Sequence, residues 1–365
     1  MHGADADLLE AGLRGRIVGQ DDAIQQVVNV YQTYLAGLAA PGRPIGNFLF
    51  LGPTGTGKTR MVEAIAETLL GDARAMVKVD CAEFQHGHEI AKLIGSPPGY
   101  LGHRETHAAL CQEALNRHHT ETVKLSFVLF DEIEKASDAL WNLLLGILDK
   151  ASLTLGDNRQ VDFSHTMIFM TSNLGAKEMM AMLEPHFGFA GRQPDLAGFA
   201  THAGRTALEA ARRKFSPEFL NRIDKVLVFQ PLGEVELRRI LDLELGALRQ
   251  RFQENCTLAR FEFSVTEPAM THLLGQGADS RYGARHLKRT LERSLVCPIS
   301  SLLASSQIRT GDSLCVDFDA EAGGLQFYTE AERPAAPARD PRTKASERRR
   351  VERAAVVGEA AANAA

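Results

Sequence analysis

The run Gly-Pro-Thr-Gly-Thr-Gly-Lys-Thr at residues 52–59 constrains the fold of this chain more than any other feature. It directly follows an apolar run at residues 47–51, and residues 59–70 have the spacing of an amphipathic helix closed by Gly71. A glycine-rich turn between a strand and a helix lets backbone N–H groups surround phosphate oxygens, and the helix dipole adds positive charge. Because both flanking conditions hold, we expect a nucleoside-triphosphate site rather than a chance glycine-rich turn.

The residues of this turn have distinct expected roles. Lys58 is placed to neutralise the terminal phosphates, and Thr59 supplies a hydroxyl for Mg²⁺, which prefers oxygen ligands. The remaining members of the predicted phosphate loop are Gly52, Pro53, Thr54, Gly55, Thr56 and Gly57. The sequence therefore predicts a nucleoside triphosphate and Mg²⁺ as cofactors.

The bulk composition sets broad limits. A chain of 365 residues is long enough for more than one domain, and a net charge of −5 argues against a general nucleic-acid coat while leaving a local basic surface open. Five cysteines without paired metal-ligand spacing suit a reducing compartment. The first residues form no signal peptide, and no apolar run approaches bilayer length. We expect a soluble cytoplasmic protein.

Five nearly all-apolar runs alternate with helical periods between residues 48 and 229. This pattern is typical of a parallel sheet covered by helices on both faces. The predicted strands are residues 47–51, 75–79, 127–130, 166–170 and 225–229. The fold class is therefore α/β, with a five-stranded parallel sheet around the phosphate loop.

The segment Pro231-Leu232-Gly233 breaks this alternation, and a smaller, mainly helical α+β lid domain is predicted after it. Its expected helices are residues 234–252, 267–274 and 284–303, and its expected strands are residues 261–263, 314–316 and 325–327. The predicted domains are an N-terminal extension (1–12), a large domain with the phosphate loop (13–230), the lid (231–328) and a tail (329–365). The tail lacks the apolar residues to fold alone, so a solvated tail is favoured over a helix induced by a partner.

Two predicted strands end in polar residues at the edge where the phosphate loop lies. Asp131 is expected to hold Mg²⁺ through water, and Glu132 to polarise the water that attacks the terminal phosphate. An isolated Asp-Glu pair would more often cap the following helix, but the upstream phosphate loop favours the catalytic interpretation. Asn173 follows the strand at residues 166–170, and its amide can hold the attacking water, although such a polar strand end alone would be read as a turn.

Together these motifs resemble those of the Clp-type AAA+ unfoldases, ring ATPases that disaggregate proteins or deliver them to partner proteases. The resemblance is to their C-terminal ATPase ring and extends from about residue 13 to residue 327. Further segments that carry it are residues 16–20 (RIVGQ), 42–46 (GRPIG), 171–175 (TSNLG), 215–224 (FSPEFLNRID) and 283–285 (GAR). Since the sequence has no second phosphate loop, coiled-coil insertion or cysteine-rich zinc module, we expect this ring to stand alone.

The resemblance implies ATP as the nucleotide and a homo-oligomeric ring, a hexamer in the family. It also implies that Ile17 and Val18 line the adenine pocket and that Arg285 senses the γ-phosphate from the lid. Arg222 would be an arginine finger that reaches the nucleotide of the neighbouring subunit, where its rigid, charged fork stabilises phosphoryl oxygens. The alternative for Arg222 is an ion pair at the domain hinge with Asp224 or Glu218.

The loop at residues 95–103 contains the pair Tyr100 and Leu101, flanked by glycines and prolines. In the resembling family such a pair lines the central pore and grips an extended polypeptide, and an aromatic face can grip many sequences by contact area. A tyrosine folded back on its own domain is the alternative. The residues that follow, His103 to His107, depart from the acidic and glycine residues usual in the family.

The segment Phe187-Gly188-Phe189 lies where protease-associated relatives carry an aliphatic-Gly-Phe docking tripeptide. Docking on a peptidase partner is a hypothesis here, and an ordinary buried turn is favoured over it. The predicted function is ATP-dependent unfolding or remodelling of unfolded or aggregated protein clients, which are threaded through a ring pore, with no membrane or nucleic-acid partner. The rivals are a nucleic-acid motor or loader and a regulatory subunit that binds ATP without turnover.

Overall fold

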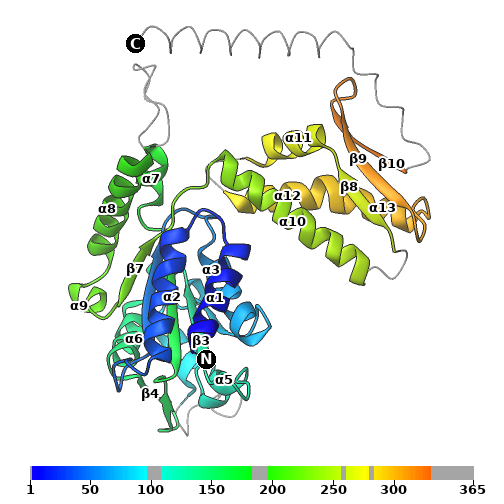
Figure 1. Cartoon of the computed structure of the whole chain (residues 1–365). Helices are drawn as coiled ribbons and strands as arrows, with labels where there is room; N and C mark the ends of the chain where they lie inside the picture. The colour runs from blue at the N-terminus through cyan, green and yellow to red at the C-terminus, as the bar shows by residue number, and fades with distance from the viewer. Residues whose placement is uncertain (1, 97–107, 183–195, 256–259, 279–282, 330–365) are drawn as a thin grey trace, which may run out of the picture.

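The computed structural model describes residues 2–96, 108–182, 196–255, 260–278 and 283–329. Tyr100 and Leu101, the segment Phe187-Gly188-Phe189 and the tail from residue 330 onward lie outside these residues. Figure 1 shows the described chain as two lobes, a larger one with the helices up to α9 and a smaller one with α10 to α13. None of the described helices is both long enough and apolar enough to span a bilayer.

The large lobe contains the predicted five-stranded sheet, in which each strand is parallel to its neighbours in the order β2-β3-β6-β1-β7. All side chains of the two central strands β1 and β6 are buried, as expected for strands covered on both faces. The strands are β1 (Gly46–Leu51), β2 (Val77–Asp80), β3 (Ser126–Asp131), β6 (Thr166–Ser172) and β7 (Lys225–Val228). The predicted fold class is confirmed.

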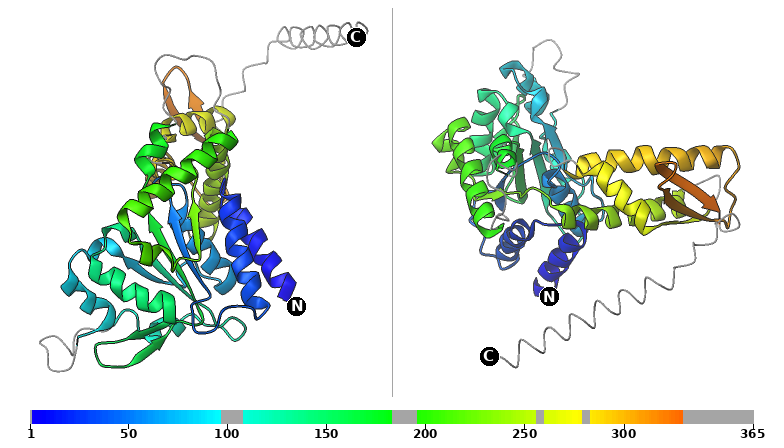
Figure 2. Two further views of the ribbon diagram at one scale, coloured as in Figure 1. Left: turned by 90° about the vertical axis from the view of Figure 1, so that its left-hand side faces the viewer. Right: turned by 90° about the horizontal axis from the view of Figure 1, so that it is seen from above.

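Alternation along each strand builds two separate cores, one on each face of the sheet. Helices cover both of these faces (Figure 2). Phe48 and Phe50 of β1 pack against α1 (His2–Arg16), α2 (Asp21–Leu35) and α3 (Lys58–Leu70). On the opposite face, Leu49 and Leu51 belong to the core of α6, α7 and α8. These helices span Asp138–Lys150 (α6), Ala176–Ala181 (α7) and Leu196–Lys214 (α8).

Helix α1 is continuous across residue 12, where the sequence suggested the end of an extension. Leu9 and Leu13 are completely buried against the helices of the first core, so both sides of that position belong to the packed lobe. A hairpin of β4 (Ser152–Thr154) and β5 (Gln160–Asp162) was also absent from the sequence-based prediction. The other short elements are η1 (Cys81–Glu83), η2 (Gly87–Ile90), α4 (Ala91–Ile94), α5 (Gln112–Asn116), η3 (Ile133–Lys135) and α9 (Pro217–Leu220).

The small lobe packs its helices on a three-stranded sheet of order β10-β9-β8. Its elements are α10 (Glu234–Asn255), β8 (Glu262–Val265), α11 (Glu267–Gly277), α12 (Ala284–Leu291), α13 (Cys297–Ala304), β9 (Ser313–Asp319) and β10 (Gly324–Thr329). The single helix expected at residues 284–303 contains a π-helical turn, η4 (Glu292–Val296). Pro298 has no N–H to donate to the carbonyl of Ser294, which accounts for the interruption of the α-helical pattern.

Candidate functional site

The phosphate loop connects β1 to α3 at the carboxyl edge of the sheet. Gly52 has a φ of 137°, and a Cβ on it would lie 2.5 Å from the carbonyl oxygen of Phe229. Gly57, with a φ of 102°, forms the N-cap of α3. Side chains at these positions would be strained, so the glycines allow the turn that aims the N-terminus of α3 into the site.

Lys58 is buried, with 8% of its surface exposed. Its ammonium group donates to the carbonyl oxygens of Gly52 at 2.7 Å and Pro53 at 2.8 Å, and to Oδ1 of Asn173 at 2.9 Å. These contacts use all three N–H bonds of the group. A bound phosphate must therefore replace at least one of them.

Asp131 lies at the end of β3 beside the start of α3. Its Oδ1 accepts a hydrogen bond from Thr59 at 3.3 Å and another from Thr171, and Oδ2 lies 3.0 Å from the ammonium of Lys78. Burial acts to raise the pKa of Asp131, but the hydrogen bonds from Thr171 and Lys78 outweigh it and hold this pKa below its usual value. Asp131 is thus kept ionised, as a ligand for a cation must be.

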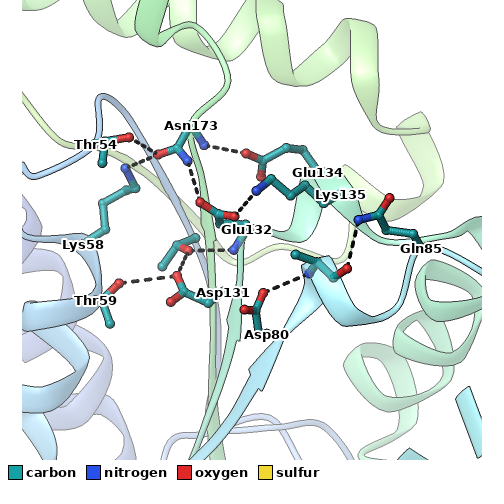
Figure 3. Close-up of polar contacts among 12 residues, drawn as sticks. Thr54, Lys58, Thr59, Asp80, Gln85, Asp131, Glu132, Glu134, Lys135 and Asn173 are labelled. Atoms are coloured by element: carbon teal, nitrogen blue, oxygen red, sulfur yellow. Dashed lines mark hydrogen bonds and ion pairs between the residues drawn. The ribbon is translucent and has the colours of Figure 1, made fainter. Parts of the chain in front are cut away.

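Glu132 follows directly and has left-handed backbone angles, φ 58° and ψ 50°. Such a conformation costs free energy for a residue with a side chain, so its presence at a site is a sign of functional constraint. Its carboxylate forms an ion pair with Lys135 and accepts from the amide of Asn173 at 3.3 Å. Figure 3 shows Lys58, Glu132 and Asn173 pointing toward one another from three different elements.

A cavity of about 780 Å³ lies between the two lobes and includes most of the predicted site. From the large lobe it is lined by Ile17, Val18, Thr54, Gly55, Thr56, Gly57, Lys58, Thr59, Asp131, Glu132 and Asn173, and from the small lobe by Arg285. The small lobe closes on the phosphate loop directly, because the N–H of Ala284 donates to the carbonyl of Gly55 at 3.1 Å. A Cβ on Gly283 would lie 2.7 Å from that same carbonyl oxygen, so this approach requires glycine.

Gln20 links the phosphate loop to the start of the small lobe. Its side chain is buried, and its Nε2 donates to the carbonyl of Gln230 at 2.9 Å and to that of Thr56 at 3.3 Å. Its Oε1 accepts from the N–H of Gln230 at 3.0 Å. The segment that leads out of β7 into the small lobe is therefore tied to the nucleotide site.

Arg222, among the described residues, is a predicted site residue that does not line this cavity. Its Nη1 donates to the carbonyl of Glu218 at 3.2 Å, its Nη2 lies 3.4 Å from the Glu218 carboxylate, and its Nε lies 3.6 Å from Asp149. The ion pair with Glu218, considered from the sequence as an alternative, is thus present within one chain. Asp224 is instead paired with Arg43 at 3.6 Å.

Lys78 and Thr171 are among the groups of this site to which the sequence gave no role. Lys78 is exposed on the edge strand β2 and reaches Asp131 only because β2 pairs with β3. Thr171 of β6 links the side chain of Asp131 to the main chain of Glu132, since its hydroxyl donates to the Asp131 carboxylate and accepts from the backbone N–H of Glu132 at 3.0 Å. Polarity at the end of β6 was a usable signal for Thr171, whereas Lys78 required knowledge of the strand order.

Burial lowers the pKa of Lys58 to about 8, against the opposing effect of the Glu134 and Asp131 carboxylates. A bound phosphate favours the charged form of Lys58. At pH values where Lys58 is neutral in the free protein, nucleotide binding is therefore accompanied by uptake of a proton by Lys58. We expect nucleotide affinity to be nearly constant below this pKa and to fall as the pH rises above it, by up to about tenfold per pH unit. Calorimetric titration of ADP at about pH 7 to 9.5 in buffers of different ionisation enthalpy measures the affinity and the number of protons taken up on binding. Constant affinity without proton uptake would contradict this expectation.

Two family models match consecutive parts of the chain. One is described as an AAA domain of the Cdc48 subfamily and covers residues 43–226. The other is described as the C-terminal, D2-small domain of ClpB protein and covers residues 232–316. The boundary between the two matches coincides with the segment between the lobes.

Curated relatives and solved structures show the same similarity. Chaperone protein ClpB of Rhodopirellula baltica is 38% identical over 86% of this chain and 33% of its own length. The ATP-dependent Clp protease ATP-binding subunit ClpC of Staphylococcus saprophyticus is 37% identical over 85% of this chain and 36% of its own. The chain thus spans about a third of the length of these relatives.

Among solved structures, a closed-state reconstruction of Hsp104 with ATPγS and FITC casein aligns with a TM-score of 0.74 at 28% identity, over 90% of this chain and 52% of that one. A Saccharomyces cerevisiae Hsp104–casein complex in an extended conformation aligns with a TM-score of 0.73 at 29% identity, over 88% of this chain and 52% of that one.

Proposed function

Since the chain belongs to the Clp-type AAA ATPases, we propose that it hydrolyses ATP and uses the energy to unfold or remodel proteins. The observation that carries the proposal is the cavity in which the phosphate loop, Asp131, Glu132 and Asn173 face Arg285 of the small lobe. Sites that join two domains in this way can convert the loss of a phosphate into a rotation of one domain against the other.

We propose the following division of roles at the phosphate. Lys58 exchanges its contact with Asn173 for the terminal phosphate, while the backbone N–H groups of the loop hold the inner phosphates. The freed Oδ1 of Asn173 can then accept a hydrogen bond from the attacking water, and the carboxylate of Glu132, which accepts from Nδ2 of Asn173 at 3.3 Å, polarises that water. Arg285 neutralises charge on the phosphoryl oxygens from the small lobe.

Mg²⁺ fits the residues at the start of α3. The hydroxyl of Thr59 and Oδ1 of Asp131 lie 3.3 Å apart, both are oxygen donors, and the carboxylate is kept ionised. When bound there, Mg²⁺ would neutralise charge on the terminal phosphates. Lys78, which faces the other oxygen of Asp131, balances that carboxylate in the free protein.

The ring and its client are further parts of the proposal. Arg222 lies outside the cavity of its own chain, which is the placement expected of a finger that completes a neighbour's site. We propose a homo-oligomeric ring in which Tyr100 and Leu101 contact a polypeptide. Both similar structures hold Hsp104 together with casein, which supports a protein client. Peptidase docking through Phe187-Gly188-Phe189 stays a hypothesis.

The experiment that tests this function compares two stimulators of ATP hydrolysis. The purified assembly is given ATP and Mg²⁺ with an unfolded protein such as casein, or with single-stranded DNA of equal mass. We expect the unfolded protein to raise the ATPase rate several-fold and DNA to leave it unchanged. Preferential stimulation by DNA would favour a nucleic-acid motor, and bound nucleotide without phosphate release would establish a regulatory subunit. Either result rejects the proposed function.

A further inference from the structure

The chain reverses direction immediately after β3, at the short turn η3. Glu132 enters this turn in the left-handed conformation, and Lys135 closes it by donating its N–H to the carbonyl of Glu132 at 2.9 Å. As a result the side chains of Glu132 and Glu134 both face the end of β6, although one residue lies between them (Figure 3). Of these two carboxylates, only Glu132 had a role that was expected from the sequence.

Glu134 contacts the main chain of the residue that holds the water. Its Oε1 accepts a hydrogen bond from the backbone N–H of Asn173 at 3.0 Å. Its Oε2 is buried and finds no hydrogen-bond partner among the described residues. A carboxylate oxygen buried in this way costs free energy, so its retention here calls for a compensating role.

The side chain of Asn173 connects two groups of opposite charge, and this requires one orientation. Its Oδ1 accepts from Lys58 at 2.9 Å, and its Nδ2 donates to Glu132 at 3.3 Å. A different rotamer of the Asn173 side chain would break both contacts. Asn173 follows directly after the end of β6, so sheet pairing does not fix the backbone of Asn173. Two residues later the chain turns at Gly175, which is left-handed with φ 75°.

We propose that Glu134 is a positioning residue: it anchors the main chain of Asn173 so that the carboxamide stays aligned with the water-polarising Glu132, also after Lys58 has moved to the phosphate. This inference rests on the proposed ATP hydrolysis. Glu134 acts by accepting the hydrogen bond from the backbone N–H of Asn173. This anchoring requires an acceptor oxygen at position 134 rather than a negative charge. A glutamine at this position keeps an amide oxygen as acceptor, whereas an alanine keeps none.

The test compares Glu134→Ala and Glu134→Gln with the wild-type assembly. The control is Glu83→Ala, which removes an exposed carboxylate of η1 outside the cavity lining. We expect Glu134→Ala to lower kcat about 10-fold to 100-fold, because small misplacements of catalytic groups have effects of this size. The Kd for a non-hydrolysable ATP analogue should change by less than about threefold, since the phosphate loop is intact. Glu134→Gln should keep most of kcat.

Hydrogen exchange at the amide of Asn173 provides a readout that does not depend on hydrolysis. Protection should be lost in Glu134→Ala and retained in Glu134→Gln. The inference is overturned if kcat of Glu134→Ala equals that of the wild type, if Glu134→Gln is as impaired as Glu134→Ala, or if Asn173 stays protected in both variants. A wild-type protein without ATPase activity would instead reject the proposed function, while the exchange data would still decide whether Glu134 anchors Asn173.

Discussion

Replacing Glu132 by glutamine is expected to lower ATP turnover by about 100-fold to 10,000-fold, the range typical for loss of a positioned general base. The carboxylate accepts a hydrogen bond from Nδ2 of Asn173 at 3.3 Å, so the two side chains lie close enough to contact one water beside them. Glutamine has nearly the same shape but cannot take up a proton from that water. Nucleotide binding and assembly should persist, because the phosphate loop and Asp131 are unchanged.

Phosphate release under saturating ATP measures this effect, and binding of a fluorescent ATP analogue checks that the site is filled. Glu121→Gln, which changes an exposed carboxylate outside the cavity lining, is the matched control and should turn over at the wild-type rate. Normal hydrolysis by Glu132→Gln would show that another group activates the water. If the variant is slow as expected, clients that stay bound to it in the presence of ATP can be identified directly.

Replacing Arg222 by alanine is expected to lower turnover by about 1,000-fold or more, the size of effect known for arginine fingers. The side chain lies outside the cavity of its own chain and is held by Glu218 and Asp149. In the assembly we expect it to leave these carboxylates for the phosphates of a neighbouring subunit. Arg213→Ala, on the exposed side of α8, is the control.

Mixing two inactive variants separates action in trans from action within one chain. An Arg222→Ala subunit has a complete site of its own, and a Glu132→Gln subunit has a complete finger. If the finger acts across the interface, a freely exchanged equal mixture should recover about a quarter of the wild-type rate, since half of the sites are intact and half of these meet an intact finger. If no activity is recovered, Arg222 acts within its own chain. The ion pair with Glu218 would then be a sufficient role for it.

The parts of the fold that follow a strong local pattern were predicted well. The five apolar runs became the five strands of the sheet, and the resemblance to Clp-type ATPases is confirmed by the family matches. The hairpin β4–β5 was missed because its strands have three residues each, too few to show an alternation. Helix α1 has a weak amphipathic pattern, yet Leu9 and Leu13 are completely buried.

The polar network of the site depends on strand order, which local patterns do not encode. Lys78 and Asp131 are 53 positions apart in the sequence and meet because β2 lies beside β3. Glu134 reaches Asn173 because Glu132 takes a left-handed conformation that no residue preference would suggest. The roles assigned to Arg222, Arg285, Tyr100 and Leu101 stay predictions.

The central claim is that ATP hydrolysis between subunits drives a polypeptide past Tyr100. Its most direct test is the rate at which the assembly, with ATP and Mg²⁺, unfolds a stable fluorescent protein that carries an unstructured tail. We expect the wild-type assembly to reduce the fluorescence only when ATP is present. With Tyr100→Ala the fluorescence should persist, although that variant continues to hydrolyse ATP. Two results would contradict the central claim. One is a wild-type assembly that hydrolyses ATP while the reporter stays folded, and the other is unfolding that is unaffected by Tyr100→Ala.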